Sequence, residues 1–215
     1  MSKVYKQDNM TIHNADCMEI MAGYEDNYFD LAVVDPPYGI NINSNIGRRK
    51  GDVKKHKKQN WDKLPPSEDY FKELSRVSKK QIIWGANNFK YLNPSNGWIV
   101  WDKCLSGDVD FSEAELAFTN VKNNTKIFKL RAQSNENYSV KIHPTQKPIK
   151  LYNWIYANYA EEGQTILDTH GGSFSNAIAA HYAKMGEFVG CELDEDYFKA
   201  SCERIRKETR QMELF

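Results

Sequence analysis

The feature that most constrains the fold of this chain is the alternation of short apolar runs with amphipathic patterns of helical period. Strands are predicted at 31–34, 81–84, 98–101, 165–168 and 188–192, which are rich in β-branched or aromatic residues. Helices are predicted after Ser67, after Pro148, around 177–180 and from Asp194. Strands that alternate with helices form parallel sheets covered on both faces, so the sequence predicts an α/β fold with a mainly parallel sheet.

Two segments complete the expected organisation. Asp16 is predicted to cap a short helix that carries Met18, Ile20 and Met21. Residues 103–141 instead contain strand-like pieces at 115–118 and 126–130 among Asn, Ser and Asp residues. We interpret 103–141 as a small insertion in a single domain spanning 1–215, because this length is enough for one large core and short for two.

Composition restricts the class of protein. The chain is 40% hydrophobic, 13% aromatic and 27% charged, as expected for a globular protein in water. It has no apolar stretch of membrane-spanning length and no apolar signal core near Met1, so we expect a cytoplasmic protein. The four cysteines form no C-x-x-C pair and have no histidine at ligand spacing. We therefore expect neither a metal site nor a disulfide framework.

A candidate catalytic loop directly follows the predicted strand 31–34. It consists of Asp35, Pro36, Pro37 and Tyr38. Each proline fixes φ and removes a backbone donor, so the Asp35 carboxylate and the Pro36 carbonyl remain acceptors that no neighbouring amide neutralises. Two acceptors beside an aromatic ring suit the amino group of a nucleobase, with Tyr38 stacked on the base. The alternative is an ordinary Pro-Pro turn with a capping acid and a core tyrosine.

A basic segment lies shortly after this loop. Residues 48–58 contain seven Lys or Arg residues and one acid, although the whole chain has a formal net charge of +0. The candidate DNA-binding residues in this segment are Arg48, Arg49, Lys54, Lys55, Lys57 and Lys58. Such a cluster can neutralise several phosphates. It can equally be a solvated charge run without a partner.

A second candidate site runs from Asp168 through Gly171 and Gly172 to Glu192. This order is typical of adenosine-cofactor sites: one acid ends a strand, glycines precede the following helix, and a second acid ends the next strand. The glycines allow close approach of the ligand, and the second acid accepts hydrogen bonds from ribose hydroxyls. A packing turn with an ordinary acidic strand end is the alternative. The chain has no G-x-G-x-x-G sequence, which argues against a nicotinamide dinucleotide.

Taken together, the segments 35–38, 143–148 and 167–173 resemble the amino-group DNA methyltransferases that use S-adenosylmethionine. The resemblance covers nearly the whole chain. The catalytic motif precedes the cofactor motif, an order similar to the permuted β-group of that family and to its short phage or mobile-element members. The resemblance implies a doubly wound, Rossmann-like methyltransferase sheet with a small inserted recognition region.

The resemblance also implies roles for individual residues. Asp35, Pro36, Pro37 and Tyr38 would form the catalytic loop. The cofactor-binding residues would be Asp16, Cys17, Lys147, Asp168, Thr169, His170, Gly171, Gly172, Ser173, Glu192 and Leu193. Glu192 would hold the ribose, and Asp16 would contact the adenine or simply cap its helix. Within 143–148, Thr145, Gln146 and Lys147 would face the methionine end of the cofactor.

The glycine loop departs from the family pattern at one position. Where relatives have Asp-Pro-Phe-x-Gly-Ser-Gly, this chain has Phe174 in place of the last glycine. If that position requires a positive φ, a phenylalanine there is strained.

The expected substrate is double-stranded DNA, with the target base flipped out of the helix. Aspartate at the first position of the catalytic loop favours adenine within this family, while N4-cytosine activity and a catalytically silent DNA-binding protein are the alternatives. The insertion, with Lys126 and Arg131, is the candidate for target recognition. Because it is small, either the recognised sequence is short or a homodimer forms.

Overall fold

The computed structural model describes residues 3–40, 64–92, 97–105, 112–131 and 141–210. A single nine-stranded sheet runs through the molecule in the order β1-β2-β9-β8-β3-β4-β6-β5-β7. The strands are β1 (Lys3–Gln7), β2 (Met10–Asn14), β3 (Phe29–Val34), β4 (Ser78–Trp84), β5 (Trp98–Asp102), β6 (Ala114–Thr119), β7 (Lys126–Lys129), β8 (Thr165–Asp168) and β9 (Glu187–Cys191).

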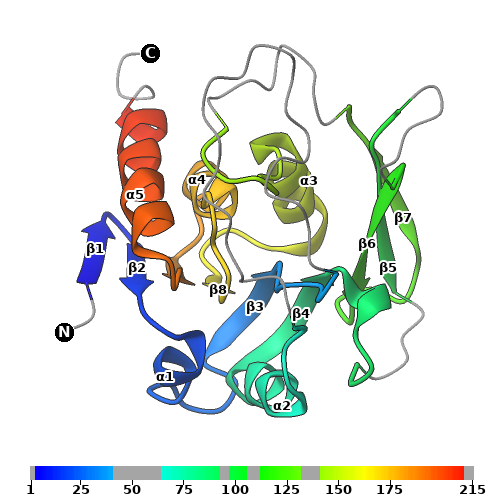
Figure 1. Ribbon diagram of the computed structural model, residues 1–215, viewed down its shortest axis with the longest axis horizontal. Helices are drawn as coiled ribbons and strands as arrows, with labels where there is room; N and C mark the ends of the chain where they lie inside the picture. Colours follow the sequence, from blue (N-terminus) through cyan, green and yellow to red (C-terminus); the bar gives the residue numbers. More distant parts are fainter. Residues whose placement is uncertain (1–2, 41–63, 93–96, 106–111, 132–140, 211–215) are drawn as a thin grey trace.

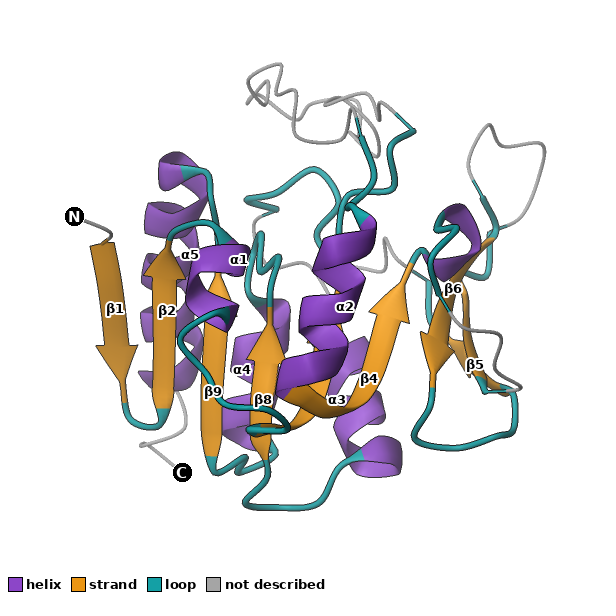
Figure 2. Ribbon diagram, turned by 90° about the horizontal axis from the view of Figure 1, so that it is seen from below, coloured by secondary structure: helices purple, strands orange, loops and turns teal. Residues whose placement is uncertain are grey.

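Most strand pairs are parallel. The pairs β2–β9, β9–β8, β8–β3, β3–β4 and β5–β7 are parallel, whereas β1–β2, β4–β6 and β5–β6 are antiparallel. The prediction of a mainly parallel sheet is therefore confirmed. The antiparallel pairs lie toward the two ends of the sheet, so the central strands all end at the same edge, which is the upper edge in Figure 2.

Helices cover both faces of the sheet. One face carries α1 (Cys17–Met21) and α2 (Glu68–Val77), and the other carries α3 (Ile149–Tyr159), α4 (Ser175–Tyr182) and α5 (Glu195–Arg210), as Figure 1 shows. A single 3-10 turn, η1 (Ala86–Asn88), follows β4. Parallel strands with helices on each face give the doubly wound architecture predicted from the sequence.

Two buried clusters form the core. Beneath α3, α4 and α5 the cluster includes Ile12, Trp84, Leu151 and Phe188, and beneath α1 and α2 it includes Phe29, Leu74 and Val189. The central strands contribute to both, since successive side chains of a strand point to opposite faces. For that reason β3 reads as a continuous apolar run, with all four residues of 31–34 at 1% exposure or less.

The helices begin at the predicted capping residues. The Asp16 carboxylate accepts the amide hydrogen of Met18 at 2.8 Å, and the Ser67 hydroxyl accepts that of Tyr70 at 3.4 Å. The helix predicted after Pro148 begins at Ile149. No helix in the described part of the chain combines the length and the apolar character needed to cross a membrane.

The described residues of 103–141 do not form a separate layer. Their strands β6 and β7 join the main sheet on either side of β5, and β6 pairs directly with β4. Through this pairing β6 brings Glu115, a residue that the sequence analysis did not single out, toward the centre of the molecule.

Candidate active site

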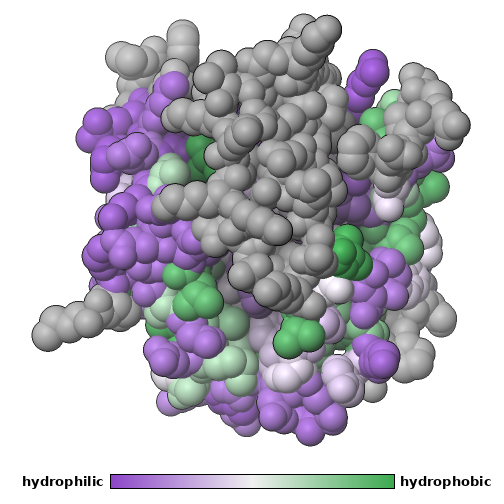
Figure 3. Space-filling model, in the orientation of Figure 1, coloured by the Kyte–Doolittle hydropathy of each residue, from purple (hydrophilic) through white to green (hydrophobic). Residues whose placement is uncertain are grey.

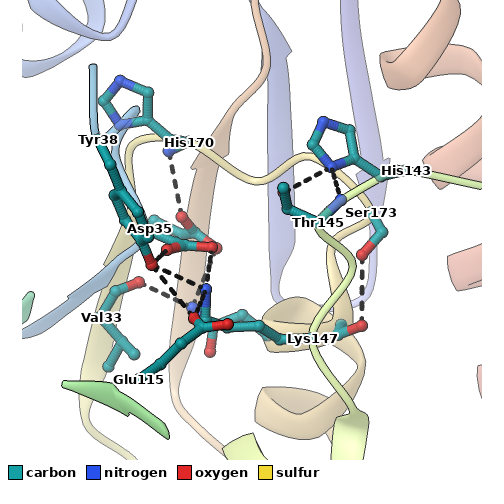
Figure 4. Close-up of polar contacts among 12 residues, drawn as sticks. Val33, Asp35, Tyr38, Glu115, His143, Thr145, Lys147, His170 and Ser173 are labelled. Atoms are coloured by element: carbon teal, nitrogen blue, oxygen red, sulfur yellow. Dashed lines mark hydrogen bonds and ion pairs between the residues drawn. The ribbon is translucent and has the colours of Figure 1, made fainter. Parts of the chain in front are cut away.

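The predicted catalytic and cofactor segments meet at the carboxyl edge of the sheet. Strand β3 leads into Asp35 and pairs with β8, which ends at Asp168. The side chain of Asn176 joins them, because its amide donates to the Val33 carbonyl and to Asp168 Oδ2, both at 3.0 Å. Figure 4 shows Val33 and Asp35 near Tyr38, Glu115 and Lys147 at this centre. The chemistry proposed below requires this proximity of segments that are distant in the sequence.

Asp35 has a hydrogen-bond donor at each of its carboxylate oxygens. The Tyr38 hydroxyl donates to Oδ1 at 2.7 Å, and the Lys147 ammonium lies 2.5 Å from Oδ2. Burial raises the pKa of Asp35, with Lys147 opposing the rise and Glu115 adding to it. The side chain of Asp35 retains 17% exposure, so it is enclosed but reachable.

Tyr38 lies against Gly85, which follows β4. A Cβ at Gly85 would come within 2.1 Å of Tyr38 Cε1, and Gly85 itself has φ +69°. Only glycine leaves room for this ring and adopts that backbone conformation without strain. The tyrosine ring is thereby held with its hydroxyl toward Asp35. Pro36 is buried in the same loop, and Pro37 is partly exposed.

Lys147 lies between two carboxylates. Besides Asp35, its ammonium is 3.0 Å from Glu115 Oε2, and its side chain is only 4% exposed. The pKa of Lys147 is raised, since Asp35 and Glu115 outweigh the burial that acts to lower it. The Lys147 ammonium is directed to the predicted catalytic loop, and its predicted contact with the cofactor stays a prediction.

Glu115 was missed by the sequence analysis. Its Oε1 lies 2.8 Å from the Lys103 ammonium, and Lys147 and Lys103 together hold its pKa down to about 2 against the effect of burial. The available signal was weak: an acid within the otherwise apolar run 114–118. Nothing local in the sequence shows which cations face that acid.

The glycine loop is fixed to the end of β9. The amide of Gly171 donates to the Cys191 carbonyl at 2.8 Å, and the amide of Gly172 donates to Glu192 Oε2 at 2.9 Å. The other oxygen of Glu192 accepts from the Asp194 amide at 2.8 Å. Glu192 therefore couples the loop to the start of α5.

Two carboxyl groups of this loop region have unusual pKa values. Burial raises the pKa of Asp168 and that of Glu192 to about 7. The Asn176 amide and the His170 amide donate to Asp168, so each carboxyl receives hydrogen bonds from neutral groups. Buried acceptors of this kind fit the hydroxyl and ammonium donors of an adenosine-containing amino-acid cofactor such as S-adenosylmethionine.

His170 extends the loop toward α1 and α2. Its Nδ1 lies 2.9 Å from the Thr169 hydroxyl, which lies 2.6 Å from the Tyr70 hydroxyl. Burial lowers the pKa of His170 to about 4, with nearby Asp16 opposing the shift. His170 is thus neutral at physiological pH.

Asp16 performs the capping function described above, and contact with an adenine ring stays a prediction. Cys17 follows it as the first residue of α1 and is partly buried. Leu193, in contrast, is 73% exposed directly after Glu192. These residues flank the end of β9 and border the glycine loop from the side of β2.

The segment 143–148 packs on the glycine loop. A Cβ at Gly172 would lie 3.4 Å from the His143 ring, and that ring contacts Tyr197 with centroids 4.4 Å apart. Thr145 bonds His143 Nδ1 at 3.1 Å, and the Gln146 side-chain oxygen accepts from the Ile142 amide at 3.0 Å. The sequence analysis correctly grouped this segment with the glycine loop, and its contacts with a cofactor remain a prediction.

Phe174 has φ +50° and ψ +37°, in the left-handed region. Its side chain is fully buried, and its ring occupies the space that a Cβ at Gly171 or Gly190 would need. The expectation of strain at this position is therefore met. The ring compensates by filling the core beneath the loop.

The two candidate DNA-binding residues that the structure describes do not lie at this centre. Lys126 and Arg131 are exposed on and after β7, at the outer edge of the sheet and separated from β4 by β6 and β5. Arg48, Arg49, Lys54, Lys55, Lys57 and Lys58 lie outside the described residues. In the part that is described, no group of three or more potential ligands is placed to hold a metal.

Comparison with known proteins agrees with this arrangement. The sequence profile of the DNA methylase family that covers N6 and N4 amino methylation matches residues 78–203, more than half of the chain. The chain belongs to this family of amino-group DNA methyltransferases. The predicted family, fold class and cofactor, S-adenosylmethionine, are thereby confirmed.

Individual relatives of this DNA methyltransferase are distant. It is 22% identical to the type II methyltransferase M2.MboI of Moraxella bovis, over 94% of this chain and 89% of the relative. Its fold matches the M1.HpyAVI–SAM complex with a TM-score of 0.61 at 19% identity, over 91% of this chain and 99% of that one. It matches the cytosine-N4-specific PvuII methyltransferase with a TM-score of 0.64 at 13% identity, over 97% and 94%.

Proposed function

We propose that this protein transfers a methyl group from S-adenosylmethionine to the exocyclic N6 nitrogen of adenine in double-stranded DNA. The observation that carries the proposal is the Asp35 carboxylate, enclosed directly after β3, together with the Asn176 amide, which joins Val33 of that strand to Asp168 before the glycine loop. Aspartate at this position of the loop favours adenine in the family that the sequence resembles. Methylation of the N4 nitrogen of cytosine is the alternative.

In this proposal the protein acts mainly by positioning. S-adenosylmethionine supplies an electrophilic methyl group when it is bound. The amino nitrogen of a nucleobase is a poor nucleophile, since its lone pair is delocalised into the ring. Hydrogen bonds from that amino group to Asp35 and to the Pro36 carbonyl favour a pyramidal nitrogen with a localised lone pair. The bond from nitrogen to the methyl carbon would form as the bond from that carbon to the cofactor sulfur breaks, and the nitrogen would give up one proton to water.

Glu192, Asp168 and the glycine loop would hold the cofactor. Glu192 would accept the ribose hydroxyls, and Asp168, His170, Gly172 and Ser173 would surround the amino-acid portion. Support comes from the carboxyl groups of Asp168 and Glu192, which accept hydrogen bonds from neutral groups. It also comes from the Gly171 amide, which holds the loop backbone against the end of β9. A base stacked in a duplex does not reach this centre, so the target must be flipped out of the helix.

Residues 103–141 would contribute to recognition of the DNA sequence. Exposed Lys126 and Arg131 lie at one end of the sheet and offer positive charge to phosphates. The described part of this segment is small, which agrees with a short target or with two copies of the chain acting on one site. Sedimentation of the protein with and without DNA distinguishes a dimer from a monomer.

The first prediction tests the assignment of Asp35. Replacement by Asn keeps the shape of the side chain but removes the charge and one acceptor. We expect methyl transfer to fall on the order of 100-fold or more, because the amino group is no longer held and polarised. The binding of S-adenosylmethionine, measured by calorimetry, should remain within about twofold of wild type. Turnover of the Asp35→Asn variant near the wild-type rate would refute the assignment.

The identity of the methylated base is decided by digesting methylated DNA to nucleosides and separating them by mass spectrometry. N6-methyladenine supports the proposal, and N4-methylcytosine replaces it with the alternative. If the wild-type protein binds cofactor and DNA but yields neither product on DNA of varied sequence, it is a silent DNA-binding protein.

A further inference from the structure

Both donors that bond Asp35 also reach a second carboxylate. The Tyr38 hydroxyl is 2.7 Å from Asp35 Oδ1 and 3.3 Å from Glu115 Oε2. The Lys147 ammonium is 2.5 Å from Asp35 Oδ2 and 3.0 Å from the same Glu115 oxygen. Figure 4 shows Glu115 and Asp35 converging on these two donors from different strands.

This arrangement matters because Asp35 is occupied in the structure. Both oxygens of Asp35 already accept a donor, so an incoming amino group must either share an oxygen with Tyr38 or Lys147 or displace one of them. Lys147 is 4% exposed and has no access to bulk water in this position. A buried ammonium that loses its carboxylate without gaining another is strongly destabilised. Without a second acceptor, release of Asp35 would therefore be opposed.

Glu115 is prepared to act as that acceptor. Its Oε1 is paired with Lys103 at 2.8 Å, and the two lysines keep its pKa at about 2. Lys103 is itself fixed on the neighbouring strand, since its amide donates to the Glu113 carbonyl at 2.8 Å. Glu115 is therefore ionised throughout the physiological range, with one oxygen held and the other directed at Tyr38 and Lys147.

We propose that Glu115 is a positioning residue that takes over Lys147 and Tyr38 when Asp35 turns to the amino group of the substrate. The inference rests on the proposed role of Asp35. Glu115 acts through Lys147 and Tyr38 and does not itself contact the base. The combined charge of the two carboxylates and two ammonium groups stays zero throughout the exchange, so no net charge is buried or exposed.

The decisive experiment is steady-state kinetics of Glu115→Gln with DNA and S-adenosylmethionine. The glutamine side chain keeps the shape of Glu115 but has no charge to pair with two lysines, so the Lys147 ammonium stays bonded to Asp35. We expect kcat to fall on the order of 10- to 100-fold, with KM for DNA and the Kd of the cofactor within about twofold of wild type. Glu203→Gln is the matched control, because Glu203 is exposed on α5 and lies outside the segments assigned to catalysis or DNA binding, and it should behave as wild type.

The pH profile of kcat separates this role from a merely structural one. Asp35 faces Tyr38 in its own loop, Lys147 before α3, Tyr152 on α3, Glu115 on β6 and Asp168 on β8. Glu115 contributes to raising the pKa of Asp35, so its loss moves the acid limb to lower pH. Lys103→Met should move the acid limb the other way, because Lys147 still keeps Glu115 ionised while one positive charge is lost beside the two carboxylates. A structural defect would lower kcat without these opposite displacements.

The conservative variant Glu115→Asp keeps the charge and should recover part of kcat and the wild-type acid limb. If thermal melting shows that Glu115→Gln does not fold, the Lys103→Met variant decides. A reduced kcat with the acid limb moved to higher pH supports the inference, and wild-type behaviour overturns it. Wild-type kcat and pH profile in a folded Glu115→Gln also overturn it. If Asp35→Asn is active, the proposed role of Asp35 fails, and the inference falls with it. If Asp35→Asn is inactive but the folded Glu115→Gln variant keeps the wild-type kcat and pH profile, the inference falls and the proposed role of Asp35 stands.

Discussion

At the scale of single residues, Phe174 combines an unfavourable backbone with a favourable side chain. A non-glycine residue in the left-handed region costs about 1–3 kcal/mol, whereas removing a buried phenylalanine ring costs about 3–5 kcal/mol. The ring is fully buried against Gly171 and Gly190 and contacts Phe188 edge-on. The packing term is the larger, which explains how the chain accommodates phenylalanine where relatives have glycine.

This comparison predicts an order of stability at position 174. Phe174→Ala loses the ring and keeps the strain, so we expect the free energy of unfolding to fall by about 3–5 kcal/mol. Phe174→Gly loses the ring but relieves the strain, so it should be more stable than the alanine variant by about 1 kcal/mol. Urea unfolding of the three proteins measures the order.

Phe188 supplies the matched control, because it is equally buried in β9 without a positive φ. There the order should reverse, since glycine within a strand is less stable than alanine by about 0.5–1 kcal/mol. If alanine is the more stable replacement at both positions, the left-handed backbone at Phe174 carries no appreciable strain.

Residue-level prediction from sequence succeeded where the backbone itself restricts the chemistry. Asp35 follows an apolar strand and precedes two prolines, so its position at the sheet edge could be read locally. The partners of Lys147 could not be read in this way, because they depend on which strand lies beside β4. The chain returns after β5 to insert β6 between β4 and β5, and this placement alone brings Glu115 to Lys147.

At the scale of elements, strong hydrophobic periodicity made most strands and helices predictable. The strands β1 and β2 were not predicted, because their periodicity is weak. β1 is an exposed edge strand, and β2 has buried residues only at Met10 and Ile12. Neither has the apolar run that marks the central strands. The pairing of β2 with β9 nevertheless shapes the cofactor side of the site, because Asp16 follows β2 and Asn14 bonds the carbonyls of Glu192 and Leu193.

The unit formed by β8, α4 and β9 predicts a pH dependence of cofactor binding. The pKa of Glu192 is about 7 in the free protein. A hydroxyl that donates to Glu192 favours the ionised carboxylate, so binding lowers this pKa and releases protons near neutral pH. The affinity for S-adenosylmethionine should therefore rise with pH, with a contribution from Glu192 of at most about tenfold between pH 6 and pH 8.

Calorimetric titration at pH 6, 7 and 8 in buffers of different ionisation enthalpy measures both the affinity and the protons released. Glu192→Gln should bind more weakly and lose this part of the pH dependence. The control is Glu187→Gln, the same substitution at the opposite end of β9, where the side chain accepts from Tyr28. An identical pH dependence in wild type and Glu192→Gln would remove Glu192 from the binding of the cofactor.

At the scale of the whole molecule, the chain leaves and re-enters the fold beside the catalytic loop. Gly39 and Pro65, which lie near the two ends of the segment 41–63, are in contact, since a Cβ at Gly39 would lie 2.5 Å from Pro65 Cδ. Gly39 follows β3, which ends at the carboxyl edge of the sheet, and Pro65 precedes α2, which begins at that edge. The segment that carries the lysines of 54–58 lies outside the described residues, but both of its ends join the fold beside the catalytic loop.

This arrangement leads to a prediction about salt dependence. A lysine that contacts a phosphate contributes about 0.9 to the slope of log Kobs against log salt on double-stranded DNA. Replacing Lys54, Lys55, Lys57 and Lys58 by Gln should weaken DNA binding and reduce the slope by about 2–4, depending on how many contacts are made. Fluorescence anisotropy with a labelled duplex over a range of salt concentrations measures the slope.

The control removes the same number of charges elsewhere, at Lys6, Lys184, Lys199 and Lys207. These residues are exposed on β1, on α5 and in the turn before β9, and the hydrophilic surface over α5 and β1 is visible in Figure 3. Net charge changes equally in the two variants, so general attraction to DNA is matched. Only the first set belongs to the segment whose ends join the fold beside the catalytic loop. A decrease in slope confined to that set assigns the segment to the DNA interface, and equal slopes in the two variants exclude it.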